Sequence, residues 1–140
     1  MTIREKTEAA APAEKQNRYP LAIDVYARVM AAILMLLGLR HWAIIIGVMP
    51  GETGSFEEMT LTWQLATVHL AVIDLVAAVG LWMRVAWGNV VWVWAAVTAV
   101  AMHTVFAETF GFDYGIIALH VFGLLGMGIL LFLARRAAHS

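Results

Sequence analysis

The chain has 140 residues, of which 62% are hydrophobic and 14% are charged. Because an ordinary soluble domain has about 45–50% apolar and about 25% charged residues, this composition excludes a typical soluble protein and a disordered chain. Nine Lys and Arg residues stand against ten Asp and Glu residues, a balance that gives no basic surface for a nucleic acid. The sequence contains no cysteine, which excludes disulfides, thiolate catalysis and cysteine-ligated metal sites.

Residues 1–20 contain charged residues and an Ala/Pro stretch without apolar periodicity, so we expect a mobile tail there. Four apolar segments follow, at about 21–49, 61–83, 85–109 and 116–134. Each is long enough for a helix that crosses a bilayer, which needs roughly 20 residues, and each has isolated polar residues rather than a polar face. The sequence therefore predicts an all-α integral membrane four-helix bundle over residues 21–135. We expect Thr60 to be the N-cap of the second helix and residues 136–140 to form a short tail.

The distribution of basic residues predicts the orientation of the bundle. Lys and Arg occur in the N-terminal tail, in the turn around Arg84, and at Arg135 and Arg136, whereas the other two loops contain none. Those two loops are acidic and carry Glu52, Glu57, Glu58 and Asp113. Because short cytoplasmic segments are enriched in Lys and Arg, we expect both termini in the cytoplasm.

Arg28 and Asp74 are the first candidates for a site within the membrane. A charge at the centre of a span costs about 2.5–3.5 kcal/mol, so it is expected to face the bundle and find a partner. At 1.5 Å per residue, Arg28 lies about 9 Å and Asp74 about 13 Å from the predicted inner edge, a difference that an arginine side chain covers. We expect a structural ion pair between the first two helices. The alternative is a charged site for a substrate head group or a proton.

Four histidines form a second group, because each predicted span contains one: His41, His69, His103 and His120. All four lie at roughly 8–12 Å from the predicted outer edge at 1.5 Å per residue. Imidazole is a common ligand of zinc, copper and haem iron. This layer is therefore a candidate haem or metal site, or a proton-linked or quinone-like site. Hydrogen bonding between helices is the structural alternative.

Arg40 and Glu108 extend the histidine layer toward the outer edge. Arg40 is next to His41, and we expect it either to reach outward to the interface or to pair with Glu108. The predicted polar or ligand layer thus consists of the four histidines, Arg40 and Glu108. These residue types identify no particular metal.

Short motifs in the first three segments are Tyr26-Ala27-Arg28, Leu37-Gly38-Leu39-Arg40, Ile73-Asp74-Leu75 and Gly80-Leu81-Trp82-Met83-Arg84. In this order they resemble the small DoxX-like membrane proteins over residues 22–105. The chain departs from that pattern at Asp74, where Glu is more usual, and at Arg40, where Lys is common. The resemblance implies a four-span protein of the bacterial cytoplasmic (inner) membrane. Some members of that family are membrane subunits of quinone-linked sulfur oxidoreductases, and many have no known activity. The chain also resembles uncharacterised bacterial four-span proteins with a similar charge layout.

These observations leave three functions open. The first is a non-catalytic subunit or scaffold that works through a membrane protein partner or as a homo-oligomer, with the lipid bilayer around it. The second is a redox-associated subunit that binds quinone, haem or metal at the histidine layer. The third is a small transporter, which fits less well because four spans leave little room for a pathway and no inverted repeat is visible. We favour the first, because the sequence shows no nucleophile–base pair and no phosphate loop, and so we do not expect the chain to be an enzyme by itself.

Overall fold

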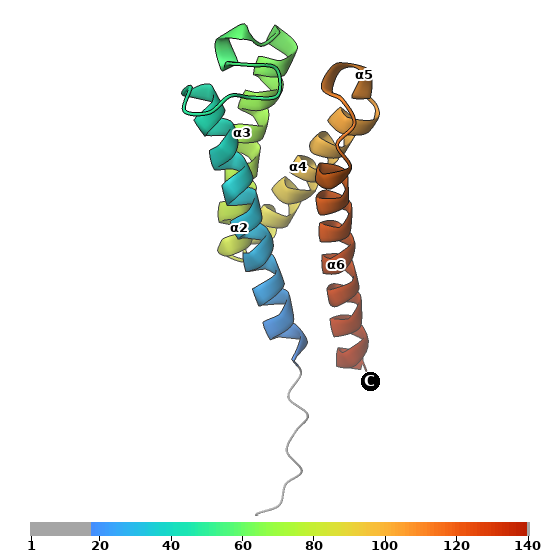
Figure 1. The fold of residues 1–140 in the computed structure, drawn as a ribbon. Helices are drawn as coiled ribbons and strands as arrows, with labels where there is room; N and C mark the ends of the chain where they lie inside the picture. Colours follow the sequence, from blue (N-terminus) through green and yellow to red (C-terminus); the bar gives the residue numbers. More distant parts are fainter. Residues whose placement is uncertain (1–17, 140) are drawn as a thin grey trace, which may run out of the picture.

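The structure is a computed structural model that describes residues 18–139, and these residues form an all-helical fold (Figure 1). The long helices are α2 (Tyr19–Ile45), α3 (Leu61–Trp82), α4 (Ala86–Thr104) and α6 (Tyr114–His139). A short helix, α5 (Ala107–Phe110), lies between α4 and α6, and a 3-10 turn, η1 (Phe56–Glu58), lies between α2 and α3. The predicted all-α class is confirmed, whereas the expected number of four helices is wrong, because the described residues form five α-helices.

The additional helix results from a break in the third predicted segment, 85–109. α4 ends at Thr104, and Phe106 leaves the helical conformation with φ −105° and ψ 26°. α5 then makes one turn and stops at Gly111, whose φ of +76° costs a glycine little. Gly47 has the same φ and ends α2 before the predicted limit at residue 49.

The two predicted tails overlap the described residues only at their inner ends. Residues 1–17 of the predicted tail at 1–20 lie outside the part that the structure describes, and Tyr19 and Pro20 already belong to α2. At the other end, α6 continues to His139, so the predicted tail at 136–140 is helical up to that residue.

Three of the described helices, α2, α3 and α6, are long and apolar enough to cross a membrane. α4 is not among them; it has 19 residues, which include the polar Asn89 and His103. Thr60 is the N-cap of α3 as predicted, because its hydroxyl accepts a hydrogen bond from the backbone N–H of Trp63 at 3.4 Å.

The turn between α3 and α4 is tied to the beginning of α2. Arg84 in this turn has a φ of +58°, in the left-handed region that reverses the chain within a few residues. Its Nε donates a hydrogen bond to Oδ1 of Asp24 at 2.8 Å. We call the half of the molecule that holds this turn and both described termini the tail end, and the opposite half the loop end (Figure 1).

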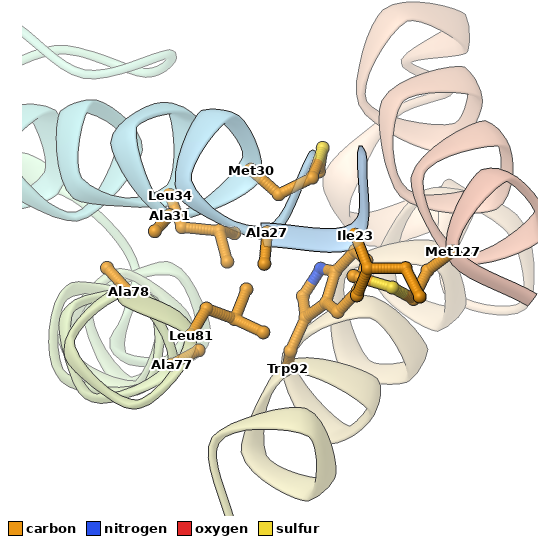
Figure 2. Packing of buried hydrophobic residues seen from close by; sticks show 10 residues of the cluster. All are labelled: Ile23, Ala27, Met30, Ala31, Leu34, Ala77, Ala78, Leu81, Trp92 and Met127. Atoms are coloured by element: carbon orange, nitrogen blue, oxygen red, sulfur yellow. The ribbon is translucent and has the colours of Figure 1, made fainter. Parts of the chain in front are cut away.

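The core lies where the four long helices meet (Figure 2). Trp92 of α4 is its largest side chain, is 1% exposed, and reaches toward Ile23 of α2 and Met127 of α6. Between α2 and α3 the core is made largely of small side chains, which allow the helices to approach closely. Its remaining members are Ala27, Met30, Ala31, Leu34, Ala77, Ala78 and Leu81.

Glycines bring the helices together near the tail end. A Cβ atom on Gly80 of α3 would lie 2.5 Å from the Cα of Gly88 of α4, so these two backbones are in direct contact. α2 and α6 meet at Tyr26, whose hydroxyl donates a hydrogen bond to the carbonyl oxygen of Gly123 at 2.7 Å and whose ring lies against Gly126. The helices therefore form two arms, α2–α3 and α4–α6, which are joined toward the tail end and diverge toward the loop end (Figure 1).

Candidate functional site

A cavity of about 260 Å³ lies at the loop end, between the two arms. Its walls come from the ends of α2 and α4, the beginnings of α3 and α6, α5, and the loop that includes η1. Trp63 of α3 and Phe110 of α5 meet across it edge to face, with ring centroids 4.9 Å apart, and this contact links the arms where they are most separate. The polar side chains that line the cavity are Arg40, His41, Glu52, Thr67, His103 and Asp113.

Arg40 forms an ion pair with Glu52 at the cavity wall. Arg40 Nη2 donates a hydrogen bond to Glu52 Oε1 at 2.9 Å, and both side chains are partly exposed. The expected partner Glu108 is exposed on α5 and forms no ion pair with the described residues, so Arg40 is not paired with Glu108. The physical reason is that the loop after α2 folds back over the end of that helix and brings Glu52 to Arg40 first.

Asp113 has a structural role at the opposite wall. Its Oδ1 accepts hydrogen bonds from the backbone N–H groups of Gly115 at 2.9 Å and Ile116 at 3.1 Å. These groups belong to the first turn of α6, whose N–H donors have no partner within the helix. The carboxylate therefore fixes the beginning of α6 and adds negative charge to the cavity.

Two of the four predicted histidines, His41 and His103, line the cavity, whereas His69 and His120 are not among its lining residues. His103 Nδ1 lies 3.0 Å from the carbonyl oxygen of Gly111, a hydrogen bond that joins α4 to the link between α5 and α6. His120 is 2% exposed and close enough to His103 for an electrostatic interaction. The predicted layer is thus only partly brought together at one site.

Metal coordination requires several such side chains around one point. Within residues 18–139 no three His, Asp or Glu side chains are placed to hold a metal ion together. The Nδ1 atoms of His41 and His120 and the Nε2 atom of His69 are buried without a hydrogen-bond partner in this part of the chain. Only His41 of these three lines the cavity, and the described histidines are not arranged as a metal centre.

Arg28 and Asp74 do not form the expected ion pair. Asp74 is 2% exposed, and its Oδ2 lies 3.8 Å from Nδ1 of His41. Arg28 is exposed, and its guanidinium carbon lies 6.0 Å from the centre of the Trp82 ring. Trp82 is eight residues from Asp74 along α3, about 12 Å at 1.5 Å per residue, so the register of the two helices separates the charges.

Gly38 sets this register. Because it has no side chain, α2 approaches α3 so closely that a Cβ there would lie 3.2 Å from the backbone nitrogen of Leu75. Leu75 follows Asp74, and His41 is three residues beyond Gly38 on nearly the same face of α2. The close approach therefore places the imidazole beside the carboxylate, at the inner wall of the cavity.

The loop that covers the cavity is fixed by hydrogen bonds of its own. The backbone N–H of Ser55 donates to Oε2 of Glu58 at 3.1 Å, and Gln64 Nε2 donates to the carbonyl oxygen of Phe56 at 3.0 Å. The hydrogen bonds from the Ser55 side chain and backbone hold the pKa of the Glu58 carboxyl below its ordinary value. The loop thus has a defined shape over the cavity. Sequence reasoning missed the contribution of this loop to the cavity. Ser55 and Glu58 have the spacing of a capping box, which is the sequence signal for the ordered turn.

Comparison with known proteins assigns the chain to one family. Residues 21–138 match DUF6163, which is described as a family of unknown function. No curated protein and no solved structure matches the chain. The resemblance to the DoxX-like proteins is therefore wrong: its motifs are short, and Gly, Arg and a buried acidic residue recur in membrane helices for packing reasons alone.

Proposed function

The chain belongs to the DUF6163 family, and we propose that it is a multi-pass protein of the bacterial cytoplasmic membrane that acts as a non-catalytic subunit or scaffold through membrane partners. The observation that carries the proposal is the uncovered surface of α6. This helix has three buried residues, His120, Gly123 and Met127. Its large exposed apolar side chains include Val121, Phe122, Leu125, Ile129, Leu131 and Phe132.

An apolar surface of this extent is unfavourable in water and marks contact with lipid or with another protein. α2 and α3 have similar exposed faces, with Leu21 and Leu36 on α2 and Leu65 and Val72 on α3. A bilayer covers these faces without any specific partner. α6 also lies at the edge of the bundle, where a helix from another protein can pack along its whole length.

The charge layout supports an orientation with both termini in the cytoplasm. The four long helices alternate in direction, so Tyr19 and His139 lie at the same end (Figure 1). Four of the described basic residues, Arg18, Arg84, Arg135 and Arg136, are at that tail end. The acidic loops are at the loop end, where Arg40 is paired with Glu52. This orientation requires α4 to cross the membrane as well, although α4 is not among the three described helices that are long and apolar enough to do so.

Site-specific photo-crosslinking tests the role as a subunit. We would place p-benzoylphenylalanine at Phe122 or Phe132 on the exposed face of α6, and at Phe112 in the loop as the matched control. The proposal predicts a protein adduct of one size from the two α6 positions and none from Phe112. Adducts with lipid alone at both α6 positions would contradict a role through protein partners.

Binding of a quinone in the loop-end cavity is a second candidate function. It is favoured by the hydrogen-bonding groups of Arg40, His41 and His103, which line the cavity together with the rings of Trp63 and Phe110. Such a mixture of apolar walls and a few converging polar groups is typical of small-molecule sites. The alternative role is then that of a redox-associated subunit.

Titration with a short-chain ubiquinone, followed by tryptophan fluorescence, tests this candidate. The parent protein is expected to show saturable quenching that is lost in His103→Ala. His69→Ala is the control, because His69 is not among the cavity-lining residues. Unsaturable quenching in the parent, or equal quenching in both variants, would exclude the quinone site.

A further inference from the structure

Arg28 has an uncompensated positive charge. Its guanidinium contacts the Trp82 ring and forms no ion pair with the described residues. The nearest carboxylate along α2 is Asp24, one turn earlier, and that carboxylate is already engaged by Arg84 at 2.8 Å. Among residues 18–139, the neighbourhood of Arg28 therefore has a net charge of about +1 that no acidic group balances.

An apolar groove begins beside this charge. It has a volume of about 500 Å³ and runs between α2 and α3 on the outer surface of the molecule. Ala31, Ala32 and Met35 of α2 and Ala78, Val79 and Trp82 of α3 line it, and the alanines make it hollow. Ala31 and Ala32 are one turn beyond Arg28, so the charge lies at the tail-side end of the groove.

The guanidinium of Arg28 fits the boundary between head groups and acyl chains, nearer the cytoplasm than the depth counted along the sequence for its backbone. α2 has 27 residues and is about 40 Å long, more than the roughly 30 Å of the hydrocarbon layer, so its first turns extend beyond that layer. Trp82 is the last residue of α3, and tryptophan is enriched at this boundary. The contact with Trp82 places the guanidinium of Arg28 at the same level, with the groove extending inward from it.

We propose that Arg28 and this groove form a binding site for one anionic phospholipid of the cytoplasmic leaflet. The guanidinium donates hydrogen bonds to the phosphate oxygens of the head group, a geometry that its planar fork matches. An acyl chain lies along the alanine-lined groove. The net negative charge of the head group compensates the positive charge that the protein leaves unpaired.

An acyl chain fits the groove better than a helix from a second copy of the chain. Small residues do permit helix contacts, but a helix seated there would also have to supply an acidic group to Arg28. The acidic residues of the described part lie at the loop end, apart from Asp24, which is engaged, and Asp74, which is buried. A phosphate supplies that charge directly.

Native mass spectrometry from mixed micelles tests the site, with phosphatidylglycerol and phosphatidylethanolamine present in equal amounts. The parent is expected to retain one phosphatidylglycerol, and Arg28→Gln to lose it with a decrease in affinity of about tenfold or more. Arg135→Gln is the matched control, because it removes the same charge from an exposed position at the same end of the bundle. Equal retention of both lipids by the parent, or unchanged retention in Arg28→Gln, would overturn the proposal. A lipid-free dimer of the parent would overturn it as well.

A second pair of variants tests the groove without changing any charge. Ala32→Phe fills the groove at an exposed position and is expected to reduce retention of phosphatidylglycerol, whereas Val93→Phe, at an exposed position on α4, is not. Equal retention in the two variants would overturn the groove as the acyl-chain site. The inference rests on the proposed membrane location. That location is measured separately, by sedimentation of the protein with membranes after an alkaline carbonate wash. If the protein stays in the membranes but shows no lipid selectivity, the lipid site is refuted and the membrane location is not.

Discussion

Replacement of Gly88 by alanine tests how the two arms are joined. A Cβ atom on Gly88 would lie 2.6 Å from the carbonyl oxygen and 2.7 Å from the Cα of Gly80, whereas ordinary contacts are 3.4–4 Å. The atoms struck are backbone atoms, which no side-chain rotation can move aside. The helices must therefore separate by about 1 Å, and contacts along the α3–α4 interface are lost with them.

The expected cost follows from that geometry. Overpacking a close contact costs about 1–3 kcal/mol, and a collision with backbone belongs at the upper end, so we expect Gly88→Ala to lower the free energy of unfolding by about 2–3 kcal/mol. This corresponds to a decrease in Tm on the order of 10 °C. Gly80→Ala should behave similarly, because its Cβ would lie 2.5 Å from the Cα of Gly88.

Thermal unfolding in detergent, followed by circular dichroism, measures this effect. Gly128→Ala is the matched control, because a Cβ on Gly128 of α6 meets nothing within 4 Å. The control should have an unchanged or slightly higher Tm, since alanine is favoured over glycine in a helix by up to about 1 kcal/mol. Equal Tm values for Gly88→Ala and Gly128→Ala would refute the close contact between α3 and α4.

Three further predictions concern side-chain interactions. In double-mutant cycles of unfolding, His41→Gln and Asp74→Asn should be coupled by at least about 0.5 kcal/mol. The effects of Arg28→Gln and Asp74→Asn on the free energy of unfolding should be additive. Coupling in the second cycle alone would support the ion pair expected from the sequence. Tyr26→Phe should lower the free energy of unfolding by about 0.5–1.5 kcal/mol, because it removes the hydrogen bond to α6. Unchanged thermal unfolding would show that this bond does not join the arms. The Glu58 carboxyl should titrate below its ordinary pKa of 4.5, so its contribution to loop stability is present at neutral pH and is lost as the pH falls through the lowered value. A carbon-13 NMR titration measures that midpoint, and a value at or above 4.5 would contradict the hydrogen bonds to Ser55.

The helices themselves could be predicted from the sequence because their causes are local. Long apolar segments and the absence of strand alternation predict the class, and Thr60 begins a helix because its hydroxyl caps the next turn. The ends were less predictable. Gly47 adopts a positive φ and follows the early end of α2, and the third predicted segment breaks at Phe106, yet a glycine that ends a helix and one within it look alike in the sequence.

The partners of the polar residues could not be predicted from depth along the helices. Counting residues along each predicted helix gives Arg28 and Asp74 similar depths in the membrane. This count contains no information on helix rotation or on the register between α2 and α3. Both are set by packing, here by the contact of Gly38 with α3, which brings His41 to Asp74 and leaves Arg28 beside Trp82. The rotation of α3 and α6 likewise keeps His69 and His120 away from the cavity walls.

The cavity was also beyond sequence reasoning, because loops form much of it. The sequence identifies Glu52 and Asp113 only as acidic loop residues that indicate the orientation. Their roles as the partner of Arg40 and as the cap of α6 depend on how each loop folds back over the helices. The cavity lies between arms that glycine contacts join toward the tail end and that the ring contact of Trp63 with Phe110 links at the loop end.

We propose that the fold spans the membrane with its tail end in the cytoplasm and its loop-end cavity on the other side. Cysteine labelling in intact cells measures this orientation. Because the chain has no cysteine, a single one can be introduced at Thr53 in the first loop or at Ala138 near the end of α6. We expect a membrane-impermeant maleimide to label Thr53→Cys in intact cells, and to label Ala138→Cys only after the membrane is permeabilised. Labelling of both positions in intact cells, or of Ala138→Cys alone, would refute the proposed orientation.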